Sequence, residues 1–372
     1  MNSPPASRPS PYSIFYPTDI DTGWRDLWGI AYPFHLGDPA AEYQALRSSC
    51  VLMEYSMLYR WEIHGPGAIA TVDAVYSRNV AALANGQIAY GVFVDDDGKM
   101  IDDVTVFRVA DDRLWVIGGN LDANDALLRA ASTGQVTITE RRDETAQLAI
   151  QGPKSREILQ SITSADLTNE ALPYYTFLSD TTVGGVTGQL NRMGFTAELG
   201  YEFICDVADV ETFGNAIQNA GADHNIRWVG LTTMMPARLE GGMIMADLEY
   251  DHTSTPFECR LGWTVDFDKG DFRGRDALLA AKDEAPDRVV TVRVDGDDNV
   301  MMAPVSVNGH DVGLVTRAVP SPTFGYTLGL ARLRKDAAKA GTKLTSSDPN
   351  NPFTAEVVKT PMYDPDRSRV KS

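Results

Sequence analysis

The chain has 372 residues, and its 51 Asp and Glu residues outnumber its 33 Lys and Arg residues, which gives a formal net charge of −18 at pH 7. This acidic balance argues against a nucleic acid as the main partner, because phosphate binding depends on clustered Lys and Arg side chains. With 43% hydrophobic and 23% charged residues, the composition is that of a globular protein. The length predicts two or three domains.

The cysteines and the N-terminal residues indicate the cellular compartment in which we expect the protein. Cys50, Cys205 and Cys259 are odd in number and far apart, so they predict neither a disulfide framework nor a metal-binding CxxC knuckle. Residues 1–12 contain no apolar run that could form a signal-peptide core, and no stretch of about 18 apolar residues occurs. We therefore expect a cytoplasmic protein that does not have a membrane as a partner.

The first part of the chain mixes helical and strand-like spacing. The acidic turn Asp95–Gly98 is typical of a hairpin connection, with Gly98 supplying a positive φ angle. In chain order the predicted elements are a helix over Asp38–Cys50, a strand over Val51–Tyr55, a helix over Ala68–Tyr76, strands over Ile88–Val94, Met100–Val109 and Leu114–Ile117, and a helix over Asn124–Ser132. The segment Trp61–His64 and the turn Gly65–Gly67 lead into the helix over Ala68–Tyr76.

The rest of the chain changes character near its end, where short β runs separated by Gly, Pro and Asn replace the mixture of strands and helices. The predicted mixed elements are a strand over Ala146–Ile150, a helix over Ser155–Ile162, strands over Gly188–Arg192 and Tyr201–Asp206, and a helix over Ala208–Ala220. The predicted late strands are Val289–Val294, Val305–Val307, Val312–Val315, Leu328–Ala331 and Thr354–Val358. Because no regular βαβα rhythm occurs, the predicted fold class is α+β, with an all-β C-terminal domain that begins within Ala280–Asp287.

Local signatures of metal and nucleotide chemistry are missing from the sequence. When the calcium-loop template is placed with its required glycine at Gly98, Phe93 and Val104 fall at positions that need Asp and Glu. The 5 histidines lack metal-ligand spacing, and neither a GxSxG elbow nor a GxxxxGK[ST] loop occurs. We therefore expect no bound metal.

The adjacent carboxylates Asp102 and Asp103 are more informative. They lie near the start of an otherwise apolar strand, where neighbouring side chains point to opposite faces, so one of them must face the interior or a cleft. A carboxylate in such a place needs a partner or a task. A charged strand end remains the simpler interpretation of the pair by itself.

A set of short motifs in fixed order resembles the glycine-cleavage T-protein (aminomethyltransferase) family, which includes tetrahydrofolate-dependent demethylases such as dimethylsulfoniopropionate demethylase. The resemblance extends from about Ala41 to Tyr363. The matching segments are Gly86–Tyr90, Gly98–Val106, Gln151–Pro153, Tyr174–Phe177, Arg192–Glu202, Arg238–Glu240, Pro256–Glu258, Leu261–Trp263, Phe272–Leu278, Pro320–Thr323 and Pro361–Tyr363.

The resemblance implies a ring of three domains with the pterin of tetrahydrofolate in the central hole. Residues 1–55 and 147–285 would form a discontinuous folate-binding domain, residues 56–146 an inserted α+β domain, and residues 286–372 a C-terminal β-barrel. By position, Asp103 matches the family's catalytic aspartate. Tyr90 matches a tyrosine that lines the pterin site, and Glu202 matches a glutamate that hydrogen-bonds the pterin's amino edge. A carboxylate suits that edge because it can accept two parallel N–H bonds. The other residues that we assign to the folate site are Tyr174, Tyr175, Arg238, Trp263 and Tyr363.

Departures from the family pattern indicate which branch the chain is closer to. Met234 stands where the T-protein has an arginine, and Met245–Glu249 lacks the tyrosine of the family's LYGxD segment. Such losses resemble the demethylase branch, and we assign Met234, Met235 and Ala246 to the substrate site. The net charge of −18 also opposes docking of an acidic lipoyl carrier protein.

The sequence therefore predicts a tetrahydrofolate-dependent demethylase or methyltransferase that acts on a small N-, S- or O-methylated substrate. The alternatives are an aminomethyltransferase of a glycine-cleavage-like system and a folate-binding protein without turnover. Tetrahydrofolate has an anionic glutamate tail, for which Arg367, Arg369 and Lys371 are the predicted basic contacts.

Overall fold

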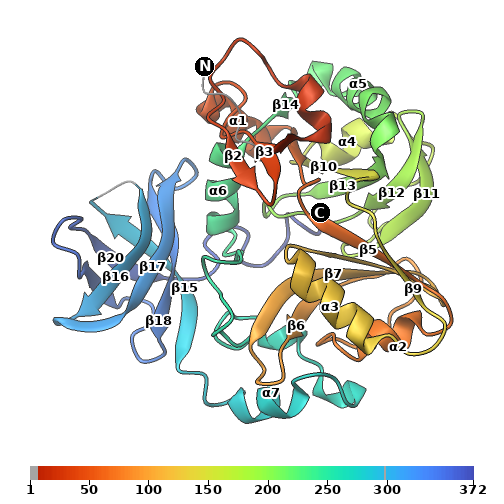
Figure 1. Cartoon of the computed structure of the whole chain (residues 1–372). Helices are drawn as coiled ribbons and strands as arrows, with labels where there is room; N and C mark the ends of the chain where they lie inside the picture. Colours follow the sequence, from red (N-terminus) through yellow and green to blue (C-terminus); the bar gives the residue numbers. More distant parts are fainter. Residues whose placement is uncertain (1–6, 297–298) are drawn as a thin grey trace.

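Three sheets form lobes around a common centre, and a smaller sheet lies at the N-terminus (Figure 1). The structure is a computed structural model that describes residues 7–296 and 299–372. None of the described helices is long and apolar enough to cross a membrane.

The first lobe contains a six-stranded sheet in the order β11-β12-β13-β10-β4-β14. All residues of β10 and β4 are buried, and Leu148 of β10 shares a core cluster with Phe203 of β13 and Phe213 of α5. Helix α1 begins after Asp38, whose side chain accepts a hydrogen bond from the N–H of Ala40 at 2.9 Å. The bounds are α1 Pro39–Ser48, β4 Val51–Glu54, β10 Thr145–Gln151, α4 Ser155–Gln160, β11 Phe177–Val183, β12 Val186–Asn191, β13 Gly200–Asp206, α5 Val210–Ala220 and β14 Arg227–Trp228.

The second lobe contains a five-stranded sheet in the order β6-β7-β8-β5-β9, with helices α2 and α3 beside it (Figure 1). In the β6–β7 hairpin, the Asp95 side chain accepts the N–H of Lys99 at 2.8 Å, and Gly98 has a φ of 72°. Asn120 caps α3 by accepting the N–H of Ala123. The bounds are β5 Tyr59–His64, α2 Ala68–Asp73, β6 Ile88–Val94, β7 Met100–Ala110, β8 Arg113–Gly118, α3 Leu121–Ala131 and β9 Thr137–Glu140.

The third lobe is a closed barrel in the order β15-β18-β17-β16-β19-β20, which leaves no free sheet edge. Its interior is filled by small branched residues, among them Val292, Val305 and Val315, each fully buried. The bounds are β15 Asp287–Asp295, β16 Val300–Val307, β17 His310–Ser321, β18 Tyr326–Arg334, β19 Lys343–Ser346 and β20 Thr354–Val358.

Helix α6 (Leu231–Glu240) stands between the first lobe and the barrel, and the segment after it passes under the second lobe to α7 (Arg275–Ala281) before the barrel begins (Figure 1). The N-terminal sheet has the order β1-β3-β2. Its bounds are β1 Arg8–Pro9, β2 Arg25–Leu27 and β3 Ile30–Tyr32. The short 3₁₀ helices are η1 Pro11–Phe15, η2 Val207–Asp209, η3 Ala222–His224, η4 Gly262–Thr264 and η5 Phe267–Lys269.

The predicted α+β class and the C-terminal barrel are confirmed. The strands of the second lobe all lie between Tyr59 and Glu140, inside the range predicted for the inserted domain, although the division into domains stays a prediction. The helix predicted to reach Tyr76 ends at Asp73, and the sequence did not predict α6. Almost all of α6 is buried, so the helix has no polar face and therefore no amphipathic period to detect.

Candidate functional site

A cavity of about 1300 Å³ lies at the centre of the molecule, lined by all three lobes and by the segment that follows α6. Most of the predicted site residues line it. They are Tyr90, Asp103, Tyr174, Tyr175, Glu202, Met234, Met235, Ala246, Trp263 and Tyr363. Arg238 is the exception.

Asp102 is held at one wall of the cavity by neutral donors. Its Oδ2 accepts hydrogen bonds from the backbone N–H of Gly119 at 2.8 Å and of Asn120 at 3.1 Å, and from Nδ2 of Asn124 at 2.6 Å. Its exposed fraction is only 2%. The sequence indicated that one carboxylate of the pair would face the interior or a cleft; in the structure Asp102 is buried, and both Asp102 and Asp103 line the cavity.

Asp103 lies between two tyrosines. Tyr90, from β6, donates its hydroxyl to Asp103 Oδ2 at 2.8 Å, and Tyr250 donates its hydroxyl to Asp103 Oδ1. The Tyr250 hydroxyl also accepts the backbone N–H of Asp103 at 3.2 Å and lies 3.4 Å from Asp102 Oδ1. Tyr250 was missed by the sequence analysis. Its only signal was its place directly after the segment in which a family tyrosine is missing.

Burial raises the pKa of both carboxyl groups of this pair. For Asp102 the negative charge of Asp103 raises the pKa further, while its three N–H donors oppose the rise. For Asp103 the hydroxyls of Tyr250 and Tyr90 oppose the effect of burial. The tyrosine hydroxyls therefore favour the charged form of Asp103 and offset part of the effect of burial on its pKa.

Glu202 lies on β13 in the opposite wall and is 3% exposed. Its Oε2 accepts a hydrogen bond from Nε2 of Gln147 at 2.7 Å, and within the described ranges this is the side-chain hydrogen bond that Glu202 receives. Burial raises the pKa of Glu202 to about 7. The carboxylate thus has spare acceptor capacity on the cavity side, which a ligand with paired N–H donors would use.

Aromatic rings provide flat faces in the cavity wall. Tyr174 and Tyr175 are in edge-to-face contact with ring centroids 4.6 Å apart. Trp263 lies 6.2 Å from the ring of Tyr90 and is 57% exposed. Such faces suit a planar ring or a cation.

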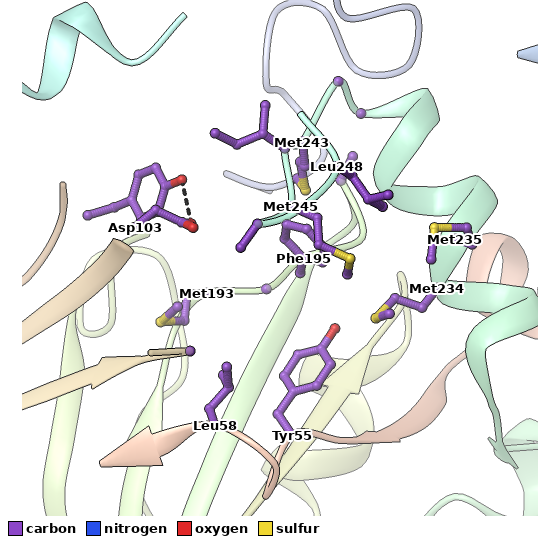
Figure 2. Close-up of a pocket in the computed structure, with 18 of the residues that line it drawn as sticks. Tyr55, Leu58, Asp103, Met193, Phe195, Met234, Met235, Met243, Met245 and Leu248 are labelled. Atoms are coloured by element: carbon purple, nitrogen blue, oxygen red, sulfur yellow. Dashed lines mark hydrogen bonds between the residues drawn. The ribbon is translucent and has the colours of Figure 1, made fainter. Parts of the chain in front are cut away.

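Methionine side chains make up much of the remaining wall. Figure 2 shows Met193 near Asp103 and shows Met234, Met235, Met243 and Met245 grouped on the other side of the cavity. Met234 is 3% exposed. Methionine is unbranched and polarizable, so this wall can adapt to irregular apolar groups.

Two family models cover most of the chain. The GCVT N-terminal domain matches residues 28–269, and the glycine cleavage T-protein C-terminal barrel domain matches residues 288–364. The chain belongs to the glycine cleavage T-protein family.

Relatives in this family match over most of the chain. An aminomethyltransferase of Streptomyces avermitilis is 34% identical, and the match covers 91% of this chain and 93% of that protein. An aminomethyltransferase of Halothermothrix orenii is 32% identical, and the match covers 90% of this chain and 94% of that protein. A trimethylamine-oxide aldolase of Ruegeria pomeroyi is 33% identical over 94% of this chain, but the match covers only 46% of that longer protein. Among solved structures, the glycine cleavage system aminomethyltransferase T from Bartonella henselae has the same fold, with a TM-score of 0.86 and 20% sequence identity over 95% of this chain and 98% of that one.

Arg238, which the family resemblance assigned to the folate site, lies outside the cavity wall. It is fully buried, and its Nη1 contacts Glu249 Oε2 at 2.5 Å. Glu249 also accepts the hydroxyl of Thr316 from β17 and the N–H of Met245. Arg238 therefore joins α6, through Glu249, to the barrel and to the segment that carries Tyr250.

The three basic C-terminal residues predicted to contact the folate tail have different positions relative to the cavity. Arg367 lines the cavity and lies 3.3 Å from the hydroxyl of Tyr174. Arg369 instead pairs with Glu198, which also accepts the hydroxyl of Tyr363, and Lys371 does not line the cavity. Of the three predicted contacts for an anionic tail, only Arg367 lines the cavity, and its role stays a prediction. In the described part of the chain, no group of three or more His, Cys, Asp or Glu could hold a metal ion.

Proposed function

We propose that this protein is a tetrahydrofolate-dependent one-carbon transferase that moves a methyl group from a small N-, S- or O-methylated substrate to N5 of tetrahydrofolate. The observation that carries the proposal is one cavity with two differently held carboxylates. Asp103 is bonded by two tyrosine hydroxyls, whereas Glu202 keeps acceptor capacity for a ligand. The family membership and the aminomethyltransferase relatives support one-carbon transfer. The name of the Ruegeria pomeroyi relative, trimethylamine-oxide aldolase, refers to a methylated amine compound.

Binding would begin at Glu202. Its carboxylate would accept two N–H bonds from the amino edge of the pterin, with Tyr174 and Tyr175 as aromatic walls. Arg367 at the cavity wall would contact the anionic tail. The cavity volume of about 1300 Å³ exceeds the roughly 300–1000 Å³ of ordinary small-molecule pockets, so two ligands can occupy it together.

The transfer step then depends mainly on proximity. The electron pair of N5 forms the new bond to the methyl carbon, and the bond from that carbon to the substrate's heteroatom breaks with its electron pair remaining on the heteroatom. The proton on N5 passes to Asp103, whose negative charge also stabilises the positive charge that develops on N5. Tyr90 and Tyr250 hold the carboxylate in one orientation during this step.

Aminomethyl transfer is the second candidate, and the names of the relatives favour it. That reaction produces methylene-tetrahydrofolate and takes its substrate from a lipoyl carrier protein. The buried, apolar Met234 at the position of the family's arginine and the net charge of −18 favour methyl transfer instead.

The purified protein is to be incubated with tetrahydrofolate and a panel of methylated ammonium, sulfonium and methoxy compounds. We expect 5-methyltetrahydrofolate in the product analysis and about 10²–10⁴-fold slower formation with Asp103→Asn, which should bind folate as the wild type does. The exposed residue Asp122 supplies the matched control Asp122→Asn, which should turn over normally. Formation of methylene-tetrahydrofolate only with a lipoyl carrier would favour the second candidate, and absence of folate binding would refute both.

A further inference from the structure

A buried arginine lies behind the cavity wall that carries Glu202. Arg60, on β5 of the second lobe, is fully buried. Its Nε donates to the hydroxyl of Thr145 at 2.8 Å, and its two Nη atoms donate to the backbone carbonyls of Leu58, Arg142 and Thr145. Among the described residues, no carboxylate forms an ion pair or hydrogen bond with this guanidinium. Because a buried arginine usually pairs with an acid, Arg60 needs another explanation.

One further N–H of Arg60 connects it to the cavity through Gln147. Nη1 of Arg60 donates to Oε1 of Gln147 at 3.4 Å, and Nε2 of Gln147 donates to Oε2 of Glu202. Ala149 of β10 pairs with Glu202 of β13, and Gln147 lies two residues before Ala149, so it is on the same face of the sheet. Gln147 and Glu202 line the cavity, whereas Arg60 does not. The three side chains thus form a chain of hydrogen bonds from the second lobe to the cavity.

The two ends of this chain fix the orientation of the Gln147 amide. A guanidinium can only donate hydrogen bonds, and an ionised carboxylate can only accept them. Burial lowers the pKa of Arg60 to about 10, so the guanidinium keeps its charge at neutral pH. The amide oxygen of Gln147 must therefore face Arg60, and its NH₂ group must face Glu202.

The NH₂ group of Gln147 has a second N–H, which has no acceptor in the part of the chain that the structure describes. Gln147 is 1% exposed, and a buried donor without an acceptor is unfavourable. Because Gln147 lines the cavity, a ligand can supply the acceptor. The cavity wall therefore offers the acceptor oxygens of Glu202 with a donor beside them. The edge of a pterin has the complementary pattern, since its two N–H donors lie next to a carbonyl oxygen.

Building on the proposed one-carbon transfer, in which Glu202 accepts the amino edge of the pterin, we propose that Gln147 is a further folate-binding residue and that Arg60 is a positioning residue that acts through it. The second N–H of Gln147 donates to the pterin carbonyl. Arg60 prevents the amide from turning its oxygen towards the ligand. Loss of either side chain therefore lowers the affinity for folate.

Calorimetry with 5-formyltetrahydrofolate measures what each side chain contributes. Gln147→Met has a similar size but lacks the amide, and it should bind this ligand about tenfold more weakly than the wild type. Arg60→Met should bind it about fivefold more weakly, because the amide of Gln147 is then free to turn. Arg141→Lys is the matched control, since Arg141 pairs with Glu62 and does not line the cavity. It should bind the ligand like the wild type.

A double-mutant cycle tests whether Arg60 acts through Gln147. In that case the double variant Arg60→Met/Gln147→Met should bind 5-formyltetrahydrofolate about as weakly as Gln147→Met alone. An arginine with only a structural role would instead give the product of the two single effects, about 50-fold. If Arg60→Met does not fold, Arg60→Lys replaces it in the cycle. This variant keeps the charge but has fewer donors, and it should bind the ligand about threefold more weakly.

Each part of the inference has an outcome that overturns it. Wild-type affinity in Gln147→Met would overturn the role of Gln147, and single effects that multiply in the double variant would overturn the positioning role of Arg60. In both cases the wild type still binds 5-formyltetrahydrofolate, so the proposed function stands. If the wild type does not bind this ligand, the proposed function and the inference both fail.

Discussion

Replacing Glu202 by glutamine separates the stability of the protein from its affinity for folate. The wild-type carboxylate is buried, and Gln147 gives it one hydrogen bond. Burial raises its pKa from 4.5 to about 7. Glutamine has the same shape without the charge, so Glu202→Gln removes the cost of burying an ion but also removes the acceptor that the pterin requires.

The effect on stability follows from proton linkage. The pKa of Glu202 is about 7 in the folded protein, against 4.5 for the same group in the unfolded chain. Because each unit of pKa difference is worth about 1.4 kcal/mol, burying the ionised carboxylate costs about 3 kcal/mol of stability. Since the folded state holds this proton more tightly than the unfolded state, the wild type gains stability as the pH falls from about 7 towards 4.5. Glu202→Gln should therefore be more stable than the wild type by up to about 3 kcal/mol at pH 8, and the difference should vanish near pH 4.5.

The effect on binding has the opposite sign. If the ionised form of Glu202 binds the pterin, the competent fraction falls from about nine tenths at pH 8 to about one tenth at pH 6, so affinity for folate should fall about tenfold. The Glu202→Gln variant loses charge-assisted hydrogen bonds worth about 1.5–3 kcal/mol. It should therefore bind folate about 10- to 100-fold more weakly than the wild type at pH 8, and its affinity should depend less on pH.

Two measurements at pH 8 and pH 6 check this reasoning. Urea denaturation reports the free energy of unfolding, and calorimetry with 5-formyltetrahydrofolate, which resists oxidation, reports affinity. Glu170→Gln, at an exposed position outside the cavity, serves as the control. A variant that binds folate like the wild type, or that retains the tenfold pH dependence, would refute the role of Glu202.

Three further variants test the rest of the site. Asp103→Asn should lower single-turnover methyl transfer by about 10²–10⁴-fold, because proton acceptance is lost, while folate affinity measured by calorimetry stays unchanged. Tyr250→Phe removes a hydrogen bond that lowers the pKa of Asp103, so the pH of half-maximal turnover should move upward; an unchanged profile would contradict this role. Arg238→Met leaves Glu249 buried without its partner and should lower the free energy of unfolding by about 3–5 kcal/mol in denaturant titrations. The double variant that also carries Glu249→Met should recover most of this lost free energy of unfolding.

The sequence predicted strands that form apolar runs, among them the fully buried β4 and β10, and connections with a marked turn. The β6–β7 hairpin was predicted because Gly98 and its acidic neighbours form a recognisable turn. Helix α6 was missed because its residues are buried on nearly every side. The turn at Trp28–Gly29 was missed for a different reason, since a tryptophan at positive φ contradicts the usual turn preferences.

The candidate site was predictable where a residue belongs to a family motif and unpredictable where it depends on contacts between distant segments. Asp103 and Glu202 lie in motifs and line the cavity. Arg238 also lies in a motif, yet it forms a buried ion pair with Glu249 outside the cavity wall, and spacing along the chain does not reveal such a pair. Tyr250 is 147 residues from Asp103 in the sequence, so only the fold brings the two together.

Asp103 and Glu202, two of the carboxylates that line the cavity, differ in one respect that fits the separate tasks we propose for them. Asp103 receives hydrogen bonds on both of its oxygens, and these oppose the rise of its pKa by burial before any ligand arrives. Glu202 receives one, and its pKa of about 7 reflects an anion that the protein itself stabilises poorly. A ligand with two N–H donors supplies what Glu202 lacks and therefore gains affinity there, whereas Asp103 gains little from binding and is suited to act on charge that develops during the reaction.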